Sequence, residues 1–181
     1  VVSSFDPKTG ERNWEVEGST TECVTTIVTD GERIFTSGGY PTNHVAAYKG
    51  DGSGELVWDN ISRVYCPSML VNDGYLYAVM DGGIAACWKT DDGTRMWKER
   101  LGGTFSGSPV LVGDRIYAAN QGGDFFVFSA DPKKFKLLQK NKLGDEIFST
   151  PTIVDGQIYV RVALDEDDAR AERLYCLERD S

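Results

Sequence analysis

The chain has few of the residues on which catalytic and metal-binding sites depend. His44 is its only histidine, in a polar stretch that predicts a surface loop, so a Ser-His-Asp triad and a multi-histidine metal site are both excluded within the chain. The four cysteines show no C-x-x-C pair and no zinc spacing. We interpret them as small buried hydrophobes, with a disulfide between Cys23 and Cys66 as the alternative.

The sequence also lacks a basic surplus and a long apolar run. It carries 19 Lys and Arg against 28 Asp and Glu, which gives a net charge of -9. Because nucleic-acid binding needs clustered positive charge, no nucleic-acid partner is expected. No apolar run approaches the roughly 20 residues of a membrane-spanning helix. The chain begins without Met and without a signal-peptide layout, which favours a processed or excised piece of a longer protein.

What the sequence has instead is glycine and aromatic residues in a regular repeat. It contains 20 Gly, 8 Phe, 8 Tyr and 4 Trp. A short apolar run, an Asp-Gly or Gly-Asp pair and a returning apolar-aromatic run recur, and the closing aromatics fall at positions 35, 77, 117 and 159. The Asp-Gly pair supplies the positive φ of a two-residue hairpin turn. Each copy therefore begins with two antiparallel strands.

A third strand follows a Gly-rich tip in each copy, and a fourth follows a further Gly. Four antiparallel strands in about 40 residues are typical of a propeller blade, so the predicted fold is an all-β propeller. A β-sandwich is the alternative, although it would not require such similar units. The chain opens on a third and a fourth strand and ends on a first, second and third. The approximate repeat units of this single domain are 1–17, 18–60, 61–100, 101–141 and 142–181.

One motif recurs at the turn between the third and fourth strands. Residues 5–14 read FDPKTGERNW, residues 87–97 read CWKTDDGTRMW, and residues 47–58 read AYKGDGSGELVW with one extra residue. The pattern resembles the A-x-D-x-x-T-G-x-x-x-W signature of PQQ-like β-propeller repeats. A fourth copy at 127–132 lacks both the Gly and the Trp, and its fourth strand, predicted over 135–138, keeps only apolar character.

The resemblance covers nearly the whole chain and implies structural roles for the repeated residues. In this family the Gly permits the tight turn and the Trp docks adjacent blades. The residues concerned are Gly10, Gly54, Gly93, Trp14, Trp58 and Trp97. Family members usually close with seven or eight blades, so about four blades imply part of a larger ring. Exposed blade edges would also favour a homodimer that completes a ring, and a strained four-bladed ring is the other alternative.

The family includes quinone-dependent dehydrogenases and outer-membrane-assembly lipoproteins, and the overall pattern most resembles uncharacterised bacterial repeat proteins. We therefore expect a non-catalytic scaffold without a cofactor, in the periplasm or at the cell surface, with a protein partner. The alternative is a fragment of a PQQ-dependent dehydrogenase, which would bind PQQ and Ca²⁺. Against it, no two cysteines are adjacent. The acidic segment 165–168 resembles a calcium loop only loosely, and a solvated hairpin is the preferred interpretation.

Binding is expected on one rim of the propeller. In an antiparallel meander, the loops from fourth to first strands share a rim with the loops from second to third strands. Candidate residues there are Arg63, Tyr65, Asp81, Phe105, Asn120, Gln121, Phe148 and Arg161. Aromatic residues and arginine are enriched at protein interfaces. Arg63 and Arg161 are the preferred candidates, because arginine often anchors an interface. The alternative is that all of these are ordinary turn residues.

Overall fold

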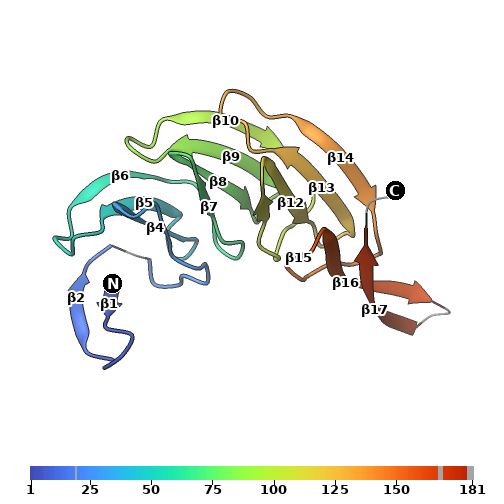
Figure 1. Ribbon diagram of the computed structural model, residues 1–181, viewed down its shortest axis with the longest axis horizontal. Helices are drawn as coiled ribbons and strands as arrows, with labels where there is room; N and C mark the ends of the chain where they lie inside the picture. Colours follow the sequence, from blue (N-terminus) through green and yellow to red (C-terminus); the bar gives the residue numbers. More distant parts are fainter. Residues whose placement is uncertain (19, 167–168, 179–181) are drawn as a thin grey trace.

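The computed structural model describes residues 1–18, 20–166 and 169–178. The secondary structure in these ranges consists of β-strands without a helix, and the strands form five antiparallel sheets. The sheets follow one another along an open arc, with the two ends of the chain at opposite ends of the arc (Figure 1). The predicted all-β propeller architecture is confirmed, and the arc does not close into a ring.

Each sheet corresponds to one blade or part of a blade. Blade 0 pairs β1 (Val2–Phe5) with β2 (Arg12–Val16). Blade 1 contains β3 (Val28–Thr29), β4 (Arg33–Gly38), β5 (His44–Lys49) and β6 (Leu56–Asn60). Blade 2 contains β7 (Leu70–Asn72), β8 (Tyr75–Met80), β9 (Ile84–Lys89) and β10 (Arg95–Arg100). Blade 3 contains β11 (Val110–Val112), β12 (Arg115–Ala119), β13 (Asp124–Ser129) and β14 (Leu137–Lys142). Blade 4 contains β15 (Thr152–Val154), β16 (Gln157–Glu166) and β17 (Ala169–Leu177).

The turns between first and second strands form because Asp-Gly pairs accept positive φ. Asp73 and Gly74 have φ of 47° and 77°, and Asp155 and Gly156 have φ of 51° and 80°. Two successive positive φ values give a type I′ turn, whose twist matches that of the flanking strands. Short first strands therefore pair with the second strands next to them in the sequence.

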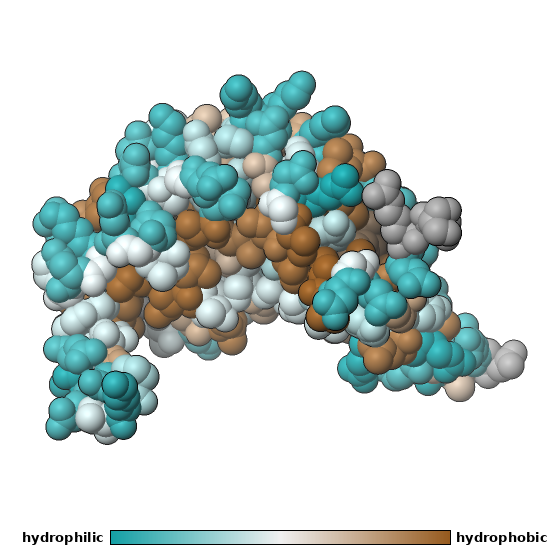
Figure 2. Space-filling view, in the orientation of Figure 1, coloured by the Kyte–Doolittle hydropathy of each residue, from teal (hydrophilic) through white to brown (hydrophobic). Residues whose placement is uncertain are grey.

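The core lies between the sheets rather than within one of them. In blades 1 to 3 the second and third strands are largely buried, because both of their faces contact a neighbouring blade. Three apolar clusters fill the interfaces between blades 1 and 2, 2 and 3, and 3 and 4. Figure 2 shows apolar side chains along the middle of the arc and polar side chains on its convex edge.

Two tryptophans of the repeated motif lie at these interfaces. Trp58 and Trp97 are each 8% exposed. The Trp58 Nε1–H donates to the Thr90 carbonyl oxygen at 2.7 Å, and the Trp97 Nε1–H donates to the Asp131 carbonyl oxygen at 2.9 Å. Each acceptor belongs to the next blade along the chain, so one indole spans each interface.

Glycine in the facing turn gives the indole its space. A Cβ added to Gly93 would lie 2.7 Å from the Trp58 ring, and one added to Gly52 would lie 2.5 Å from the ring of Trp14, which is half-buried. Gly93 and Gly52 also have φ of 70° and 81°, which disfavours a side chain independently of space. Gly10 and Gly54, both with φ of 75°, occupy equivalent turns.

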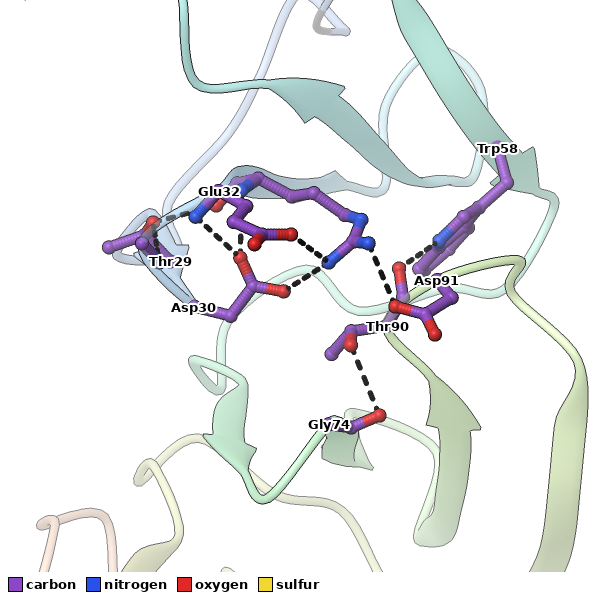
Figure 3. A network of polar contacts seen from close by, with 9 residues as sticks. Thr29, Asp30, Glu32, Trp58, Gly74, Thr90 and Asp91 are labelled. Carbon is purple, nitrogen blue, oxygen red and sulfur yellow. Dashed lines mark hydrogen bonds and ion pairs between the residues drawn. The ribbon is translucent and has the colours of Figure 1, made fainter.

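A polar network flanks the Trp58 interface (Figure 3). Arg33 pairs with Asp30 in its own blade and with Asp91 in blade 2, each at 2.8 Å. The Thr90 hydroxyl donates to the Gly74 carbonyl oxygen at 3.1 Å, which fixes the segment that accepts the indole N–H. The network therefore ties the turns of blades 1 and 2 together beside the apolar cluster.

A ladder of hydroxyl groups joins the blades just before their first strands. The Thr26 amide donates to Ser68 Oγ at 2.9 Å, the Ser68 amide to Ser108 Oγ at 3.0 Å, and the Ser108 amide to Thr150 Oγ1 at 2.9 Å. Each bond crosses one interface in the same direction. The ladder therefore ends on the Thr26 hydroxyl at one side and on the Thr150 amide at the other.

Two details of the strand prediction change. The fourth strand of blade 3 begins at Leu137 rather than at Phe135. Phe135 leaves the strand because its ring packs against Trp97, with centroids 5.5 Å apart. His44 is the first residue of β5 and half-buried rather than a loop residue, with Nε2 3.5 Å from Thr36 Oγ1.

The cysteines do not share one environment. Cys87 is fully buried, as expected for a small hydrophobe, while Cys66 is half-buried and Cys176 is exposed. Cys23 is also exposed, and its thiol donates to the Thr20 carbonyl oxygen at 3.3 Å. The interpretation as buried hydrophobes therefore holds for Cys87 only.

The acidic segment of the last repeat extends a long hairpin of β16 and β17. Their pairing continues to Glu166 opposite Ala169, while Asp167 and Asp168 lie outside the described residues. Arg173 pairs with Glu166 at 2.7 Å. The described part of the segment is thus the solvated charged hairpin that the sequence predicted.

Within the described ranges there is also no helix of the length and apolar character needed to cross a membrane.

Candidate interaction face

The two sets of loops expected on one rim do contact each other. The Phe105 amide donates to the Asp81 carbonyl oxygen at 3.0 Å, and the Ile147 amide donates to the Gln121 carbonyl oxygen at 3.3 Å. In blades 2 and 3, these bonds tie the loop between second and third strands to the loop that leads into the next blade. We call this rim the loop face, made of residues 17–18, 20–27, 39–43, 61–69, 81–83, 101–109, 120–123 and 143–151.

Asp81 and Gln121 hold the loops from within. The Asp81 carboxylate accepts the amides of Tyr65 and Cys66 at 2.8 and 3.1 Å. Gln121 occupies the corresponding place in blade 3, and its Nε2 donates to Ser106 Oγ at 2.5 Å. Both side chains therefore position neighbouring loop residues.

Arg63 and Tyr65 form an ordered cluster with Glu22 on the surface. The Tyr65 hydroxyl donates to the Glu22 carboxylate at 2.5 Å, and the Arg63 guanidinium carbon lies 5.6 Å from the centroid of the Tyr65 ring. The hydrogen bond to Glu22 raises the pKa of Tyr65, so its hydroxyl remains a donor. Arg63 is exposed and Tyr65 is half-buried. We call Glu22, Arg63 and Tyr65 the Arg–Tyr cluster.

Phe105 and Asn120 are buried, so neither offers a side chain to a partner. Phe105 is 1% exposed and packs against Phe126 between blades 2 and 3, with ring centroids 5.8 Å apart. The Asn120 Oδ1 accepts the Asp124 amide at 2.9 Å, and its Nδ2 donates to the Asp124 carboxylate at 3.2 Å. In blades 2 to 4, the loop before the first strand buries an apolar residue at a blade interface, namely Val64, Phe105 or Ile147. The expected surface position of Phe105 was therefore wrong.

Phe148 and Arg161 lie at the far end of the face. Phe148 is 48% exposed, and Arg161 is exposed on β16 and pairs with Glu172 at 3.2 Å. The structure therefore brings Arg63 and Tyr65 together but leaves Arg161 paired within its own hairpin.

Four exposed apolar or aromatic residues of the loop face were not identified from the sequence. Val24, Ile27, Tyr40 and Ile61 are 63%, 51%, 58% and 87% exposed. Tyr40 also accepts the Glu22 amide on its carbonyl oxygen at 3.1 Å, next to the Arg–Tyr cluster. Residues in loops follow no strand period, so the sequence carries no pattern that separates these exposed side chains from the buried Phe105.

The ladder residues were also missed, although the sequence holds a signal for them. Each repeat has Ser or Thr nine residues before its closing second-strand aromatic, as at Thr26 and Phe35 or at Thr150 and Tyr159. A hydroxyl recurring at one repeat position predicts a shared hydrogen bond.

The described ranges contain no group of three or more His, Cys, Asp or Glu side chains that could hold a metal ion. A Ca²⁺ site of the kind that quinone dehydrogenases use needs several oxygen ligands at one point.

A family model supports the assignment that the repeats suggest. The model described as outer membrane protein assembly factor BamB matches residues 41–132 and, in a second overlapping match, residues 91–175. No curated protein matches the chain in sequence. The two overlapping matches are offset by about one repeat, as expected for tandem units of one kind.

Solved structures with the same fold include designed and natural proteins. The computationally designed Ika8 protein has a TM-score of 0.67 and 13% identity, over 86% of this chain and 48% of that one. The designed Ika4 protein has a TM-score of 0.66 and 12% identity, over 92% of this chain and 98% of that one. These identities show the fold alone.

The natural structures are considerably longer than this chain. A quinohemoprotein alcohol dehydrogenase, ADHIIG, from Pseudomonas putida HK5 has a TM-score of 0.66 and 14% identity, over 83% of this chain and 30% of that one. A europium-containing methanol dehydrogenase has a TM-score of 0.55 and 16% identity, over 68% and 26%. The chain thus spans less than half of Ika8 and of both dehydrogenases. With its family match over most of its length, the chain belongs to the PQQ-like β-propeller repeat family described as outer membrane protein assembly factor BamB.

Proposed function

We propose that the chain is a non-catalytic scaffold that binds a protein partner through its loop face, as part of an extracytoplasmic bacterial protein. The Arg–Tyr cluster carries this proposal. Arginine and tyrosine are the residues most often found as energetic anchors of protein interfaces. The family description, which names assembly at the outer membrane, supports the location outside the cytoplasm.

The cluster is ordered before any partner arrives. Asp81 fixes the Tyr65 backbone, Glu22 fixes the Tyr65 hydroxyl, and the Tyr65 ring supports the Arg63 side chain. Ordering a long side chain on binding costs about 0.5–1.5 kcal/mol, so a preformed cluster binds with less loss of entropy. The rigid blades beneath it supply the fixed frame on which binding loops usually depend.

Photo-crosslinking in the intact parent protein tests the proposal. Benzoylphenylalanine in place of Phe148 is a conservative probe on the loop face, and the same probe at Lys134, which is exposed on the turn of the opposite rim, is the matched control. We expect a protein crosslink from position 148 that Arg63→Ala or Tyr65→Ala reduces about tenfold or more. Equal crosslinking from position 134, or no effect of either substitution, would contradict the proposal.

We also propose that two copies of this chain associate head to tail. The hydroxyl ladder supports this, because its two ends are complementary: Thr26 offers an acceptor hydroxyl and Thr150 offers a donor amide. Apolar side chains are exposed near both ends of the arc, with Phe5 at 56% and Leu174 at 71%. Burial of these groups against a second copy would remove open sheet edges.

A quinoprotein fragment is the second candidate, favoured only by the likeness of fold to the two dehydrogenases. PQQ and Ca²⁺ would then be held by residues outside this chain. Reconstitution of the intact parent protein with PQQ and Ca²⁺ tests the idea by the absorbance of the bound quinone. Absence of saturable PQQ binding would eliminate this candidate.

A further inference from the structure

The interface between blades 3 and 4 lacks the indole that spans the two preceding interfaces. In each complete blade, the closing aromatic of the second strand (Phe35, Tyr77 or Tyr117) pairs with a residue of the third strand. On its other side, that third-strand residue pairs with a residue of the fourth strand. These cross-strand pairs are Trp58↔Ala47, Trp97↔Cys87 and Gln139↔Val127. Gln139 therefore stands where blades 1 and 2 carry the interface tryptophan.

A cavity of about 510 Å³ lies beside Gln139, between blades 3 and 4. Its apolar walls come from both blades and are formed by Tyr117, Phe125, Val127, Ile158 and Leu177. Arg115, Asn141 and Glu178 also contribute to the lining. The cavity is thus lined by both apolar and polar groups.

The walls of this cavity repeat the walls around Trp58. Trp58 packs in one cluster with Phe35, Val45, Ala47, Leu76 and Trp88. Cross-strand pairing makes these residues equivalent to the apolar walls of the cavity. Phe35 pairs with Ala47 as Tyr117 pairs with Val127. Leu76 pairs with Trp88 as Ile158 pairs with Leu177. The cavity therefore has the walls of a tryptophan site, but blade 3 supplies Gln139 in place of the tryptophan. We call this cavity the indole socket.

We propose that this socket binds an indole group, supplied by a free indole derivative or by a tryptophan side chain of a peptide. The rings of Tyr117 and Phe125 lie 6.4 Å apart at 51° and offer aromatic contacts. In the filled sockets the indole N–H reaches a carbonyl oxygen, at Thr90 or Asp131. In the lining, the acceptors are side-chain oxygens. Asn141 Oδ1 accepts from Gln139 Nε2 at 3.4 Å, and Glu178 Oε2 accepts from Gln157 Nε2 at 3.2 Å; each oxygen has a second lone pair for an indole N–H.

The socket is separate from the loop face. In its lining, Gly156 lies in a turn between first and second strands, and Arg115 begins the second strand directly after such a turn. These turns lie on the rim opposite the loop face in an antiparallel meander. The socket therefore does not depend on the function proposed for the Arg–Tyr cluster, and a failure of either leaves the other intact.

Ligand-observed ¹⁹F NMR with 5-fluoroindole tests the proposal in the intact parent protein. We expect a saturable change in the 5-fluoroindole signal with the wild-type protein and with Gln139→Ala, which keeps the socket open. Gln139→Trp fills the socket from within, so we expect it to weaken binding at least tenfold and to raise the thermal midpoint. No saturable change with the wild type, or equal binding by Gln139→Trp, would overturn the proposal.

Two further measurements keep the result interpretable. Nuclear Overhauser contacts from bound 5-fluoroindole to the methyl groups of Ile158 and Leu177 are expected in the wild type, so the proposal does not depend on the folding of a variant. Their absence in a bound complex would overturn it. Competition by N-acetyltryptophanamide indicates a peptide-borne tryptophan, and binding of 5-fluoroindole without such competition indicates a free indole derivative; either supports the socket.

Discussion

Cys87 lies on β9 with Tyr77 directly opposite it on β8, both buried between blades 2 and 3. Burial raises the pKa of the Cys87 thiol from 9.0 to about 12, because the thiolate would lose its hydration there. Burial also raises the pKa of the Tyr77 hydroxyl, which donates to the Ala130 carbonyl oxygen at 2.8 Å. Both groups are therefore neutral over the physiological range.

Alkaline pH should destabilise the fold through Cys87. Its folded pKa lies above its unfolded value, so its contribution is fully present below pH 9.0 and is lost as pH rises towards about 12. We expect the thermal midpoint to fall over this window, and to fall less steeply in Cys87→Ala, which no longer carries this buried thiol. Thermal unfolding followed by circular dichroism from pH 8 upward measures both slopes. Identical slopes would show that Cys87 does not contribute.

Trp97 combines apolar contact with one hydrogen bond, and two substitutions separate these parts. Trp97→Phe removes the bond to Asp131 and should lower the free energy of unfolding by about 1 kcal/mol. Trp97→Ala also empties the contacts with Tyr77 and Phe135 and should cost about 3–5 kcal/mol. Urea unfolding measures both values. A loss below 1 kcal/mol for Trp97→Ala would mean that the indole does not hold blades 2 and 3 together.

At the scale of the strand, the hydroxyl ladder repeats the same amide-to-hydroxyl bond at three successive interfaces, with distances of 2.9, 3.0 and 2.9 Å. Ser108 is both acceptor for the Ser68 amide and donor to Thr150, so it serves two interfaces. Ser129 offers a contrast, because its Oγ is buried without a hydrogen-bond partner in the described structure.

Ser108→Ala and Ser129→Ala should therefore differ in sign or size. Ser108→Ala leaves the Ser68 amide without its acceptor and should cost about 1–3 kcal/mol. Ser129→Ala removes a polar group that has no partner and should be neutral or stabilising. Chemical denaturation of the two variants in parallel provides the comparison, and equal destabilisation would contradict the role given to the ladder.

Strand order, blade architecture and turns could be predicted from the sequence, because each repeats at a fixed spacing. The side chains of the loops could not. Asp81 and Gln121 form hydrogen bonds to neighbouring loops, and Phe105 packs between two blades. These contacts arise only when the blades have packed against each other. The socket depends on Gln139 lying opposite Val127. The sequence does not mark this position, because the fourth copy of the motif lacks both the Gly and the Trp.

For the molecule as a whole, the open arc and its exposed ends lead us to expect a dimer in solution. The chain of 20.0 kDa should elute as a dimer when light scattering measures its mass at micromolar concentration. Thr26→Val removes the acceptor at one end of the ladder and should shift the equilibrium towards the monomer. A monomeric mass for the wild type across the concentration range would contradict head-to-tail association.

The hairpin of β16 and β17 makes the loop face unequal around the arc. Its strands, of 10 and 9 residues, are the longest in the described structure, and Arg161 and Arg170 pair with Glu172 on its surface. Similar blades on their own would offer a partner several nearly equivalent places to dock. For the proposed partner, we infer that the long hairpin at one end would remove this equivalence, because it would block approach along the loop face from that end.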